Sequence, residues 1–226
     1  MSQNESAEEL AQLIDHTLLR ADATPAEIER LAQEAMEHRF KSVCVNPAWV
    51  RLAAQVVDGS DVLVCTTIGF PLGATTAANK AREAEEAVSL GAHEVDMVIA
   101  IGMLKSRRHE RVKEEIAGVV KAAGPQVGVK VILETALLTE DERREAAAIV
   151  VDAGAAFVKT STGFGPRGAT VDDVKLLREV VGSDFGVKAS GGIRTRENAL
   201  EMVQAGANRL GTSSGIAIIG AAAEGS

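Results

Sequence analysis

Two lysines stand where apolar segments run out into glycine-rich sequence, and such positions favour carbonyl chemistry. Lys159 ends the segment Ala-Ala-Phe-Val-Lys before Thr-Ser-Thr-Gly, and Lys188 stands in Phe-Gly-Val-Lys-Ala-Ser-Gly-Gly. Burial and a neighbouring cation both disfavour an ammonium, so two such lysines can leave one amine neutral near pH 7. A neutral amine attacks a carbonyl carbon and forms a Schiff base. The alternative is that each lysine extends from a strand end into solvent.

A carboxylate occupies a similar position. Asp96 stands in the apolar segment Glu-Val-Asp-Met-Val-Ile, where an unpaired charge would be costly. Beside two lysines it would be stabilised and could carry protons, although buried carboxylates also form purely structural ion pairs. Asp15 and Thr17 end an earlier apolar segment and either join this polar cluster or cap a turn. Cys44, in Val-Cys-Val, is a further candidate neighbour of the cluster.

Two turns rich in glycine and serine follow the last two apolar segments. Their backbone amides and hydroxyls are suited to phosphate, which barrels often bind after strands seven and eight. Thr162, in the turn after Lys159, is another candidate substrate contact, and Arg167 either adds a cation at the rim or is a solvated loop residue. The candidate phosphate contacts in the two turns are Gly191, Gly192, Gly211, Ser213 and Ser214.

Eight short apolar segments must position these side chains, and helical patterns separate them. Helix starts are expected at Thr24, Thr139, Thr170 and Thr195, each a residue type that caps a helix N-terminus. This alternation predicts an α/β fold, a single (β/α)₈ TIM barrel over residues 1–226 with a short N-terminal extension. An open, doubly wound sheet is the second possibility. The expected strands are 13–17, 42–46, 61–67, 93–99, 127–134, 156–160, 185–189 and 207–211.

An internal repeat predicts which residues share a level of the barrel. Three segments have Gly-Ala at a helix end followed by a strand, and the fifth residue after each glycine is Asp96, Lys159 or Gly211. Inward side chains at one level of a barrel come from alternate strands, so these three positions are expected in one layer. The alternative is that Gly-Ala only ends the helix. The segments are 91–96, 154–159 and 206–211.

Composition narrows the function classes. The chain has 226 residues, of which 46% are hydrophobic, 25% charged and only 3% aromatic, so one core of aliphatic residues is expected. The net charge of −8 argues against a nucleic-acid partner, whose phosphates would be repelled. The N-terminus does not resemble a secretory signal, and the apolar run at 216–223 is too short to span a membrane. A cytoplasmic protein is expected.

Several familiar motifs are missing from the sequence. The histidines at 16, 38, 93 and 109 show no metal-ligand spacing, so a zinc-dependent aldolase is not expected. Cys44 and Cys65 make no Cys-x-x-Cys motif and are expected as reduced core residues. The signatures of α/β-hydrolases, P-loop proteins and dinucleotide-binding proteins are missing too. Glu134, after Val-Ile-Leu, is a weaker alternative to Asp96 as a base.

Together these segments resemble the deoxyribose-phosphate aldolase family, in the right order and over nearly the whole chain. The resemblance implies a class I aldolase that interconverts 2-deoxy-D-ribose 5-phosphate with acetaldehyde and D-glyceraldehyde 3-phosphate, without a cofactor. It implies that Lys159 forms the Schiff base, that Lys188 and Asp96 exchange protons, and that the protein is a homo-oligomer, a dimer or tetramer. The matching motifs are Ile-Asp-His-Thr-Leu-Leu (14–19), Val-Cys-Val-Asn-Pro (43–47), Glu-Val-Asp-Met-Val (94–98), Phe-Val-Lys-Thr-Ser-Thr-Gly-Phe (157–164), Val-Lys-Ala-Ser-Gly-Gly-Ile-Arg (187–194) and Gly-Thr-Ser-Ser-Gly (211–215).

One feature departs from the family and two other functions remain open. Some members end in a tyrosine that assists proton transfer, whereas this chain contains no tyrosine. Such assistance is then expected from another group, or turnover is slower. The other possible functions are a different lysine-dependent aldolase or transaldolase, and a barrel that binds a sugar phosphate without catalysis.

Overall fold

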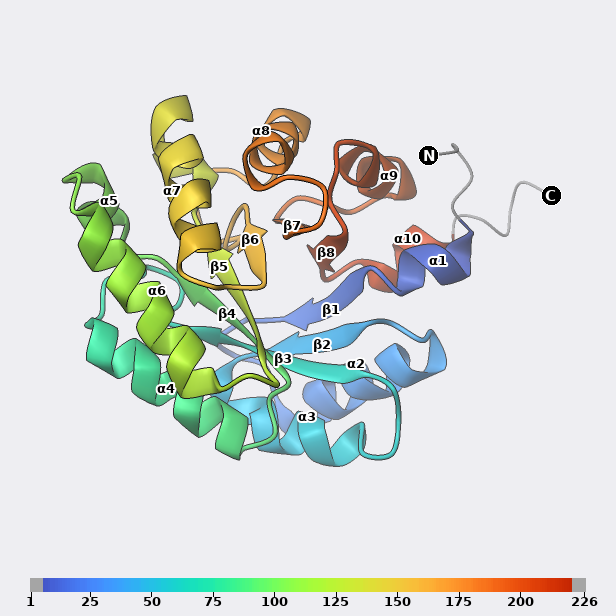
Figure 1. Ribbon diagram of the computed structural model, residues 1–226. Helices are drawn as coiled ribbons and strands as arrows, with labels where there is room; N and C mark the ends of the chain where they lie inside the picture. Colours follow the sequence, from blue (N-terminus) through green and yellow to red (C-terminus); the bar gives the residue numbers. More distant parts are fainter. Residues whose placement is uncertain (1–5, 221–226) are drawn as a thin grey trace.

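Eight parallel strands form a closed barrel in the order in which they occur along the chain (Figure 1). The computed structural model describes residues 6–220. The TIM-barrel prediction is therefore confirmed, and the open sheet is excluded because β1 pairs with both β2 and β8. The strands are β1 Ile14–Leu18, β2 Ser42–Val45, β3 Leu63–Ile68, β4 Glu94–Val98, β5 Gly128–Ile132, β6 Phe157–Lys159, β7 Gly186–Ser190 and β8 Arg209–Thr212.

Helices surround the barrel, and each strand is connected to the next by helical sequence (Figure 1). One short helix precedes β1 and forms the predicted N-terminal extension, packed beside the helix that follows β8. The α-helices are α1 Ala7–Ala11, α2 Pro25–Glu37, α3 Val50–Val56, α4 Ala77–Ser89, α5 Ile101–Lys105, α6 His109–Ala123, α7 Glu140–Asp152, α8 Val171–Val181, α9 Arg196–Gln204 and α10 Gly215–Gly220, and two 3₁₀ turns are η1 Pro47–Trp49 and η2 Thr135–Leu137.

Four helices begin directly after the threonines that the sequence predicted as their N-caps. The backbone N–H and hydroxyl of Thr24 both donate to the Glu27 carboxylate, which closes the first turn of α2. The hydroxyls of Thr139, Thr170 and Thr195 each accept a hydrogen bond from the backbone N–H three residues later. A cap of this kind stabilises a helix by about 1 kcal/mol because it pairs an N–H that the helix itself leaves unpaired.

The apolar core lies between the barrel and the helices. Outward-facing strand residues such as Val64, Val95 and Val158 are fully buried under alanine-rich helix faces, including Ala84 and Ala147. Small helix residues allow the helices to approach the sheet closely, and each buried valine contributes about 1.5–3 kcal/mol. The core therefore needs few aromatic residues, as the composition suggested.

The repeated glycines end their helices as expected. Gly91, Gly154 and Gly206 have φ values of 107°, 79° and 113°, which residues with side chains rarely adopt. They precede β4, β6 and β8, which are alternate strands of the barrel. Alternate strands contribute to common interior layers, so the repeat sets the height of the polar residues inside the barrel.

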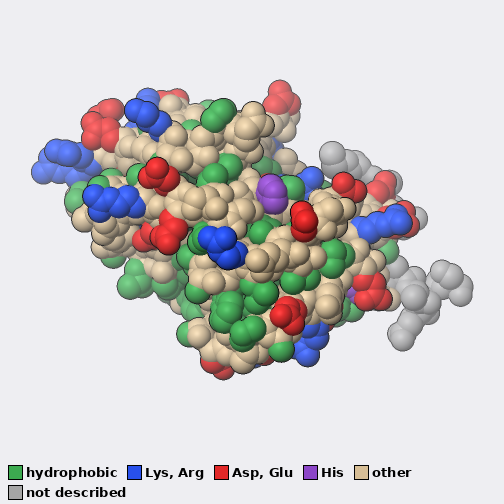
Figure 2. All heavy atoms as spheres, turned by 90° about the horizontal axis from the view of Figure 1, so that it is seen from below, with side chains coloured by type: hydrophobic (Ala, Val, Ile, Leu, Met, Phe, Trp, Pro, Cys, Tyr) green, Lys and Arg blue, Asp and Glu red, His purple; other side chains and the backbone are tan. Residues whose placement is uncertain are grey.

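Charged side chains of both signs are interspersed on the face seen in Figure 2, with apolar side chains between them. The net charge of −8 is thus not gathered into a single acidic patch on this face. Within residues 6–220, no helix is long and apolar enough to cross a membrane.

Candidate active site

Lys159, Lys188 and Asp96 meet inside the barrel. The two lysines are direct register partners on β6 and β7, so the expectation that they lie side by side is confirmed. Each donates a 2.7 Å hydrogen bond to the same atom, Oδ2 of Asp96. The geometry differs from the expected lysine–lysine contact because a shared carboxylate joins the two ammonium groups.

Asp15 and Lys130 extend this cluster. Asp15 forms an ion pair with Lys188 and so joins the cluster, although it is the second residue of β1 and does not lie at the strand end. Lys130, on β5, was not predicted: its Nζ lies 3.0 Å from Oδ1 of Asp96 and 2.7 Å from Oε2 of Glu94. The signal was present in Gly-Val-Lys-Val-Ile, a lysine within an apolar strand. It was missed because no glycine-rich turn follows directly.

Arg209 lies one layer deeper, toward the N-terminal ends of the strands. Its guanidinium donates to Oδ1 of Asp15 at 2.8 Å and to both oxygens of Glu94 at 2.8 and 3.0 Å. It also lies 5.2 Å from the centre of the Phe157 ring. Glu94, Phe157 and Arg209 are the third residues after the repeated glycines. The same repeat that predicted the upper layer could therefore have predicted this one.

Buried charges of both signs stabilise one another in this cluster. Burial alone would raise the pKa of Asp96, but Lys130, Lys159 and Lys188 outweigh it and hold that pKa well below its ordinary value. Burial likewise opposes the charge of Lys188, yet Asp15 and Asp96 raise its pKa above the ordinary value. Lys188 is thus held as an ammonium and Asp96 as a carboxylate.

A count of charges singles out one lysine. The cluster contains three carboxylates, Asp15, Glu94 and Asp96, and four basic groups, Lys130, Lys159, Lys188 and Arg209. The charges balance when one basic group is neutral. Among these seven described residues, Lys159 alone lines the cavity above the cluster, and Asp96 is its one ion-pair partner. Its amine is therefore the basic group of this cluster that can meet a ligand.

The cavity above Lys159 has a volume of about 470 Å³ and opens at the carboxyl ends of the strands. Residues after β1, β6, β7 and β8 line it, as expected for a TIM-barrel active site. Two lining cations, Arg20 and Arg194, were not predicted as site residues, although Arg194 ends the family motif at 187–194. The predicted site residues that line the cavity are Thr17, Lys159, Thr162, Gly191, Gly192, Gly211 and Ser213.

Two of the predicted glycine turns are constrained by their surroundings. A Cβ on Gly211 would lie 3.1 Å from Cε of Lys188 and 2.9 Å from Cβ of Ser190, so the glycine leaves room for Lys188. Gly191 and Gly192 have φ values of 84° and 80°, which turn the backbone along the cavity wall. Gly191, Gly192 and Ser213 line the same cavity as Lys159.

Two other candidate residues, Arg167 and Glu134, lie apart from the cavity wall. Arg167 does not line the cavity and forms ion pairs with Asp173 of α8. It is therefore neither a rim cation nor a simple solvated residue. Glu134 does not line the cavity either; it accepts hydrogen bonds from the backbone N–H and hydroxyl of Thr162. It supports the turn that follows Lys159.

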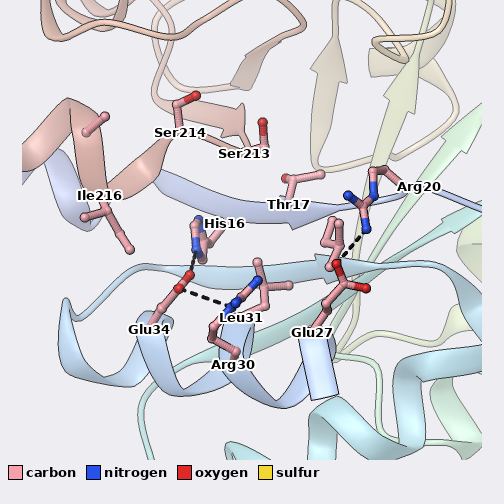
Figure 3. Close-up of a pocket in the computed structure, with 12 residues that line it drawn as sticks. His16, Thr17, Arg20, Glu27, Arg30, Leu31, Glu34, Ser213, Ser214 and Ile216 are labelled. Carbon is pink, nitrogen blue, oxygen red and sulfur yellow. Dashed lines mark hydrogen bonds and ion pairs between the residues drawn. The ribbon is translucent and has the colours of Figure 1, made fainter. Parts of the chain in front are cut away.

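Ser214 lies in a neighbouring hollow of about 550 Å³, between β1, α2 and the start of α10 (Figure 3). On its far wall, Nε2 of His16 lies 2.8 Å from the Glu34 carboxylate. Burial lowers the pKa of His16 despite this carboxylate, so the imidazole is neutral near pH 7 and the contact is a hydrogen bond. The residues that line both this hollow and the catalytic cavity are Thr17, Leu18, Arg20 and Ser213.

The two cysteines are free and buried, as predicted, and lie opposite each other on β2 and β3. Cys65 donates from its Sγ to Oδ1 of Asp96 at 3.2 Å, so the thiols adjoin the cluster. The ligand atoms of Cys44, Cys65 and Asp96 lie within 4.8 Å of one another. Ammonium groups already occupy hydrogen-bonding positions around Asp96, and a metal ion there would be repelled.

A TIM barrel with a cavity-lining lysine, a shared carboxylate and a second lysine is an architecture suited to Schiff-base enzymes. The chain belongs to the DeoC/LacD family of aldolases, whose sequence profile matches residues 9–222.

Individual relatives agree with this family. The deoxyribose-phosphate aldolase of Carboxydothermus hydrogenoformans is 58% identical over 217 residues, which cover 95% of each chain. That of Staphylococcus carnosus is 57% identical over 209 residues, covering 92% of this chain and 94% of its own. The solved deoxyribose phosphate aldolase of Aeropyrum pernix, described as a tetramer, superposes with a TM-score of 0.90 at 35% identity, covering 97% of this chain and 93% of that one.

Proposed function

We propose that the protein reversibly cleaves 2-deoxy-D-ribose 5-phosphate to acetaldehyde and D-glyceraldehyde 3-phosphate through a lysine Schiff base. The observation that carries this proposal is the pair of 2.7 Å hydrogen bonds from Lys159 and Lys188 to one oxygen of Asp96, directly below the cavity. The names of the relatives support the choice of substrate.

The first steps use the neutral amine of Lys159. It adds to the aldehyde carbon of the open-chain sugar phosphate, and loss of water gives an iminium ion. The hydroxyl on the third carbon then gives its proton to Asp96, directly or through water, while the bond between the second and third carbons breaks. D-Glyceraldehyde 3-phosphate leaves, and the electron pair of the broken bond forms an enamine on Lys159.

Lys188 and Asp96 carry out the proton transfers of the reaction. Lys188 is held as an ammonium by Asp15 and Asp96, so it is the donor, and Asp96 orients it and exchanges protons with it directly or through water. Protonation of the enamine on its second carbon regenerates an iminium ion, which water hydrolyses to acetaldehyde and free Lys159. The chain contains no tyrosine, so the help that a terminal tyrosine gives in some family members has to come from another group, or turnover is slower. Residues 221–226 lie outside the described residues.

Borohydride trapping tests the nucleophile. Acetaldehyde plus borohydride should add one reduced ethyl group, and peptide mapping should find it on Lys159, because this amine lines the cavity. An adduct on another lysine, or none in an active preparation, would overturn the assignment. A barrel that only binds sugar phosphates would bind the substrate without an adduct. A different aldolase would form the adduct but prefer another sugar phosphate in a substrate panel.

The phosphate group of the substrate is assigned to the turns at Gly191–Gly192 and Gly211–Ser213. Their backbone amides and the Ser213 hydroxyl line the cavity beside Lys159, and Arg194 adds positive charge. Ser214 lines the neighbouring hollow, so its contribution to phosphate binding is expected to be smaller.

A comparison of substrates tests this subsite. Replacing Ser213 with alanine should raise KM for 2-deoxy-D-ribose 5-phosphate several-fold more than KM for unphosphorylated 2-deoxy-D-ribose, because only the first substrate loses a contact. Ser214→Ala is the matched control and should change the two values little. Equal losses of both substrates in Ser213→Ala would refute this placement of the phosphate.

Three broader features belong to the same proposal. The 226 residues form one aldolase domain, because a single closed barrel accounts for the described part of the chain. A homo-oligomer is proposed, supported by the tetramer described for the Aeropyrum pernix relative. A cytoplasmic protein without a nucleic-acid partner fits the net charge of −8.

A further inference from the structure

The mouth of the barrel is divided into two hollows. Loops after β1, β6, β7 and β8 line the catalytic cavity, whereas loops after β2 and β3 line a second hollow of about 550 Å³. Among the described residues, none lines both. The residues that line the second hollow are Asn46, Pro47, Thr67, Gly69, Phe70, Pro71, Leu72, Ala74, Thr75 and Glu83.

Two phenylalanines meet between these hollows. Phe70 follows β3 and lines the second hollow, and Phe164 follows β6 and lines the catalytic cavity. Their rings contact edge to face, with centroids 5.4 Å apart and planes at 90°. Strands β4 and β5 separate β3 from β6 in the barrel, so this contact spans part of the mouth.

Phe164 is an exposed residue and not part of the apolar core. Its side chain is 60% exposed, and it directly follows the turn of Thr162, whose hydroxyl accepts a hydrogen bond from the Phe164 backbone N–H. That turn begins three residues after Lys159. The ring therefore stands close along the chain to the nucleophile and is free to contact a ligand.

We propose that the Phe70–Phe164 pair is a partition that determines acceptor specificity. The pair closes the route from Lys159 into the second hollow, and an acceptor aldehyde must extend toward the turn at Gly191–Gly192. This inference rests on the proposed aldolase function and adds residues that select the acceptor.

The chemistry of the second hollow indicates which acceptors the partition excludes. Glu83 is among the described residues that line it, and these include no Lys or Arg. The Glu83 carboxylate accepts a hydrogen bond from the Gly69 backbone N–H at 2.7 Å, which fixes it beside the hollow. A phosphorylated acceptor would be repelled there, whereas a neutral aldehyde with an apolar chain could pack against Phe70, Pro71 and Leu72.

The test compares two acceptors in the addition of acetaldehyde. We would measure kcat/KM for hexanal and for D-glyceraldehyde 3-phosphate with the wild type, Phe70→Ala, Phe164→Ala and the double variant. The hexanal to D-glyceraldehyde 3-phosphate ratio should rise about tenfold in each single variant, since added apolar contact discriminates by roughly that factor. The double variant should gain little more, because either change opens the partition.

Leu137→Ala is the matched control, since Leu137 is an apolar residue after β5 that is 44% exposed, lines neither hollow and forms no part of the ring contact. It should leave the ratio of the two acceptors at the wild-type value. An unchanged ratio in Phe70→Ala, or an equal rise in Leu137→Ala, would overturn the partition. Wild-type protein inactive with D-glyceraldehyde 3-phosphate would instead refute the aldolase function itself, so the two failures are distinguishable.

Discussion

Lys80 and Lys159 are both buried beside a carboxylate, yet their surroundings give them different chemistry. Lys80, on α4, is fully buried, and its Nζ donates to Glu115 of α6 at 2.8 Å and to the Val98 carbonyl at 2.7 Å. Lys159 donates to Asp96 at 2.7 Å, but Asp96 also serves Lys130 and Lys188. Lys80 is thus the one lysine among the described residues that pairs with Glu115, whereas Lys159 shares Asp96 with two further lysines.

The difference shows that burial and an ion pair do not by themselves make a nucleophile. Burial lowers the pKa of Lys80, although Glu115 acts in the opposite direction. No carbonyl substrate can reach its amine, because the side chain is fully buried between β4, α4 and α6. Lys159 combines an excess of neighbouring cations with an open cavity. A nucleophilic lysine needs both a carboxylate that is shared with other cations and a cavity through which the substrate can reach its amine.

The largest expected effect is on turnover, and it distinguishes Asp96, the carboxylate beside Lys159, from Glu115, the carboxylate beside Lys80. Asp96→Asn should lower turnover about 10²–10⁴-fold, because the variant loses the group that exchanges protons with Lys188. Borohydride trapping should persist and extend to lower pH, since an anion that favours the protonated amine is gone. Turnover close to the wild-type rate would contradict the role of Asp96. The measurements are steady-state turnover and trapping by intact mass across pH.

Glu115→Gln is the matched change at the other lysine. It leaves Lys80 buried without its carboxylate and should reduce the free energy of unfolding by about 3–5 kcal/mol, as for other broken buried pairs. Turnover per folded molecule should stay near the wild-type value. A large loss of turnover without a loss of stability would show that the two lysine sites are coupled. Urea unfolding and active-site titration provide the two readouts.

A smaller effect concerns the charge of Lys188. In Lys188→Leu, Asp15 and Asp96 lose one cation, so their negative charge should hold the proton on Lys159 to higher pH. The trapping profile should shift about one pH unit toward alkaline pH, equivalent to about 1.4 kcal/mol, while some trapping survives. The measurement is the yield of the reduced adduct at a series of pH values.

Lys80→Met is the control for this shift. It removes a buried cation of the same type from the site between α4 and α6, where the Glu115 carboxylate does not contact Lys159. Its trapping profile should therefore match that of the wild type. If Lys188→Leu also kept the wild-type profile, the charge of Lys188 would not influence Lys159.

The elements of the fold could be predicted because their signals are local. Each of the eight expected strands is present, with ends that differ by at most two residues. The threonines at four helix starts and the glycines at three helix ends act on backbone groups within a few residues. Such signals are readable in one stretch of sequence, and their alternation already implies a barrel.

The site was predicted less completely because its contacts join distant strands. Lys130 lies next to Asp96 only because β4 and β5 are neighbours in a particular register. Arg209 reaches Asp15 across 194 positions of sequence, and no local pattern marks that contact. The sequence suggested that Arg167 could be a cation at the rim of the site, but in the structure it forms an ion pair with Asp173 on the following helix.

The sequence by itself determined the residue types and their order: eight strands, their helices, two lysines and a carboxylate within the apolar strands, and glycines in the turns between them. Only the tertiary structure decided that Lys159 and Lys188 share one oxygen of Asp96 and that Phe70 meets Phe164 across the mouth. The physical reason is that charge balance and access depend on distances between strands, which arise when the barrel closes.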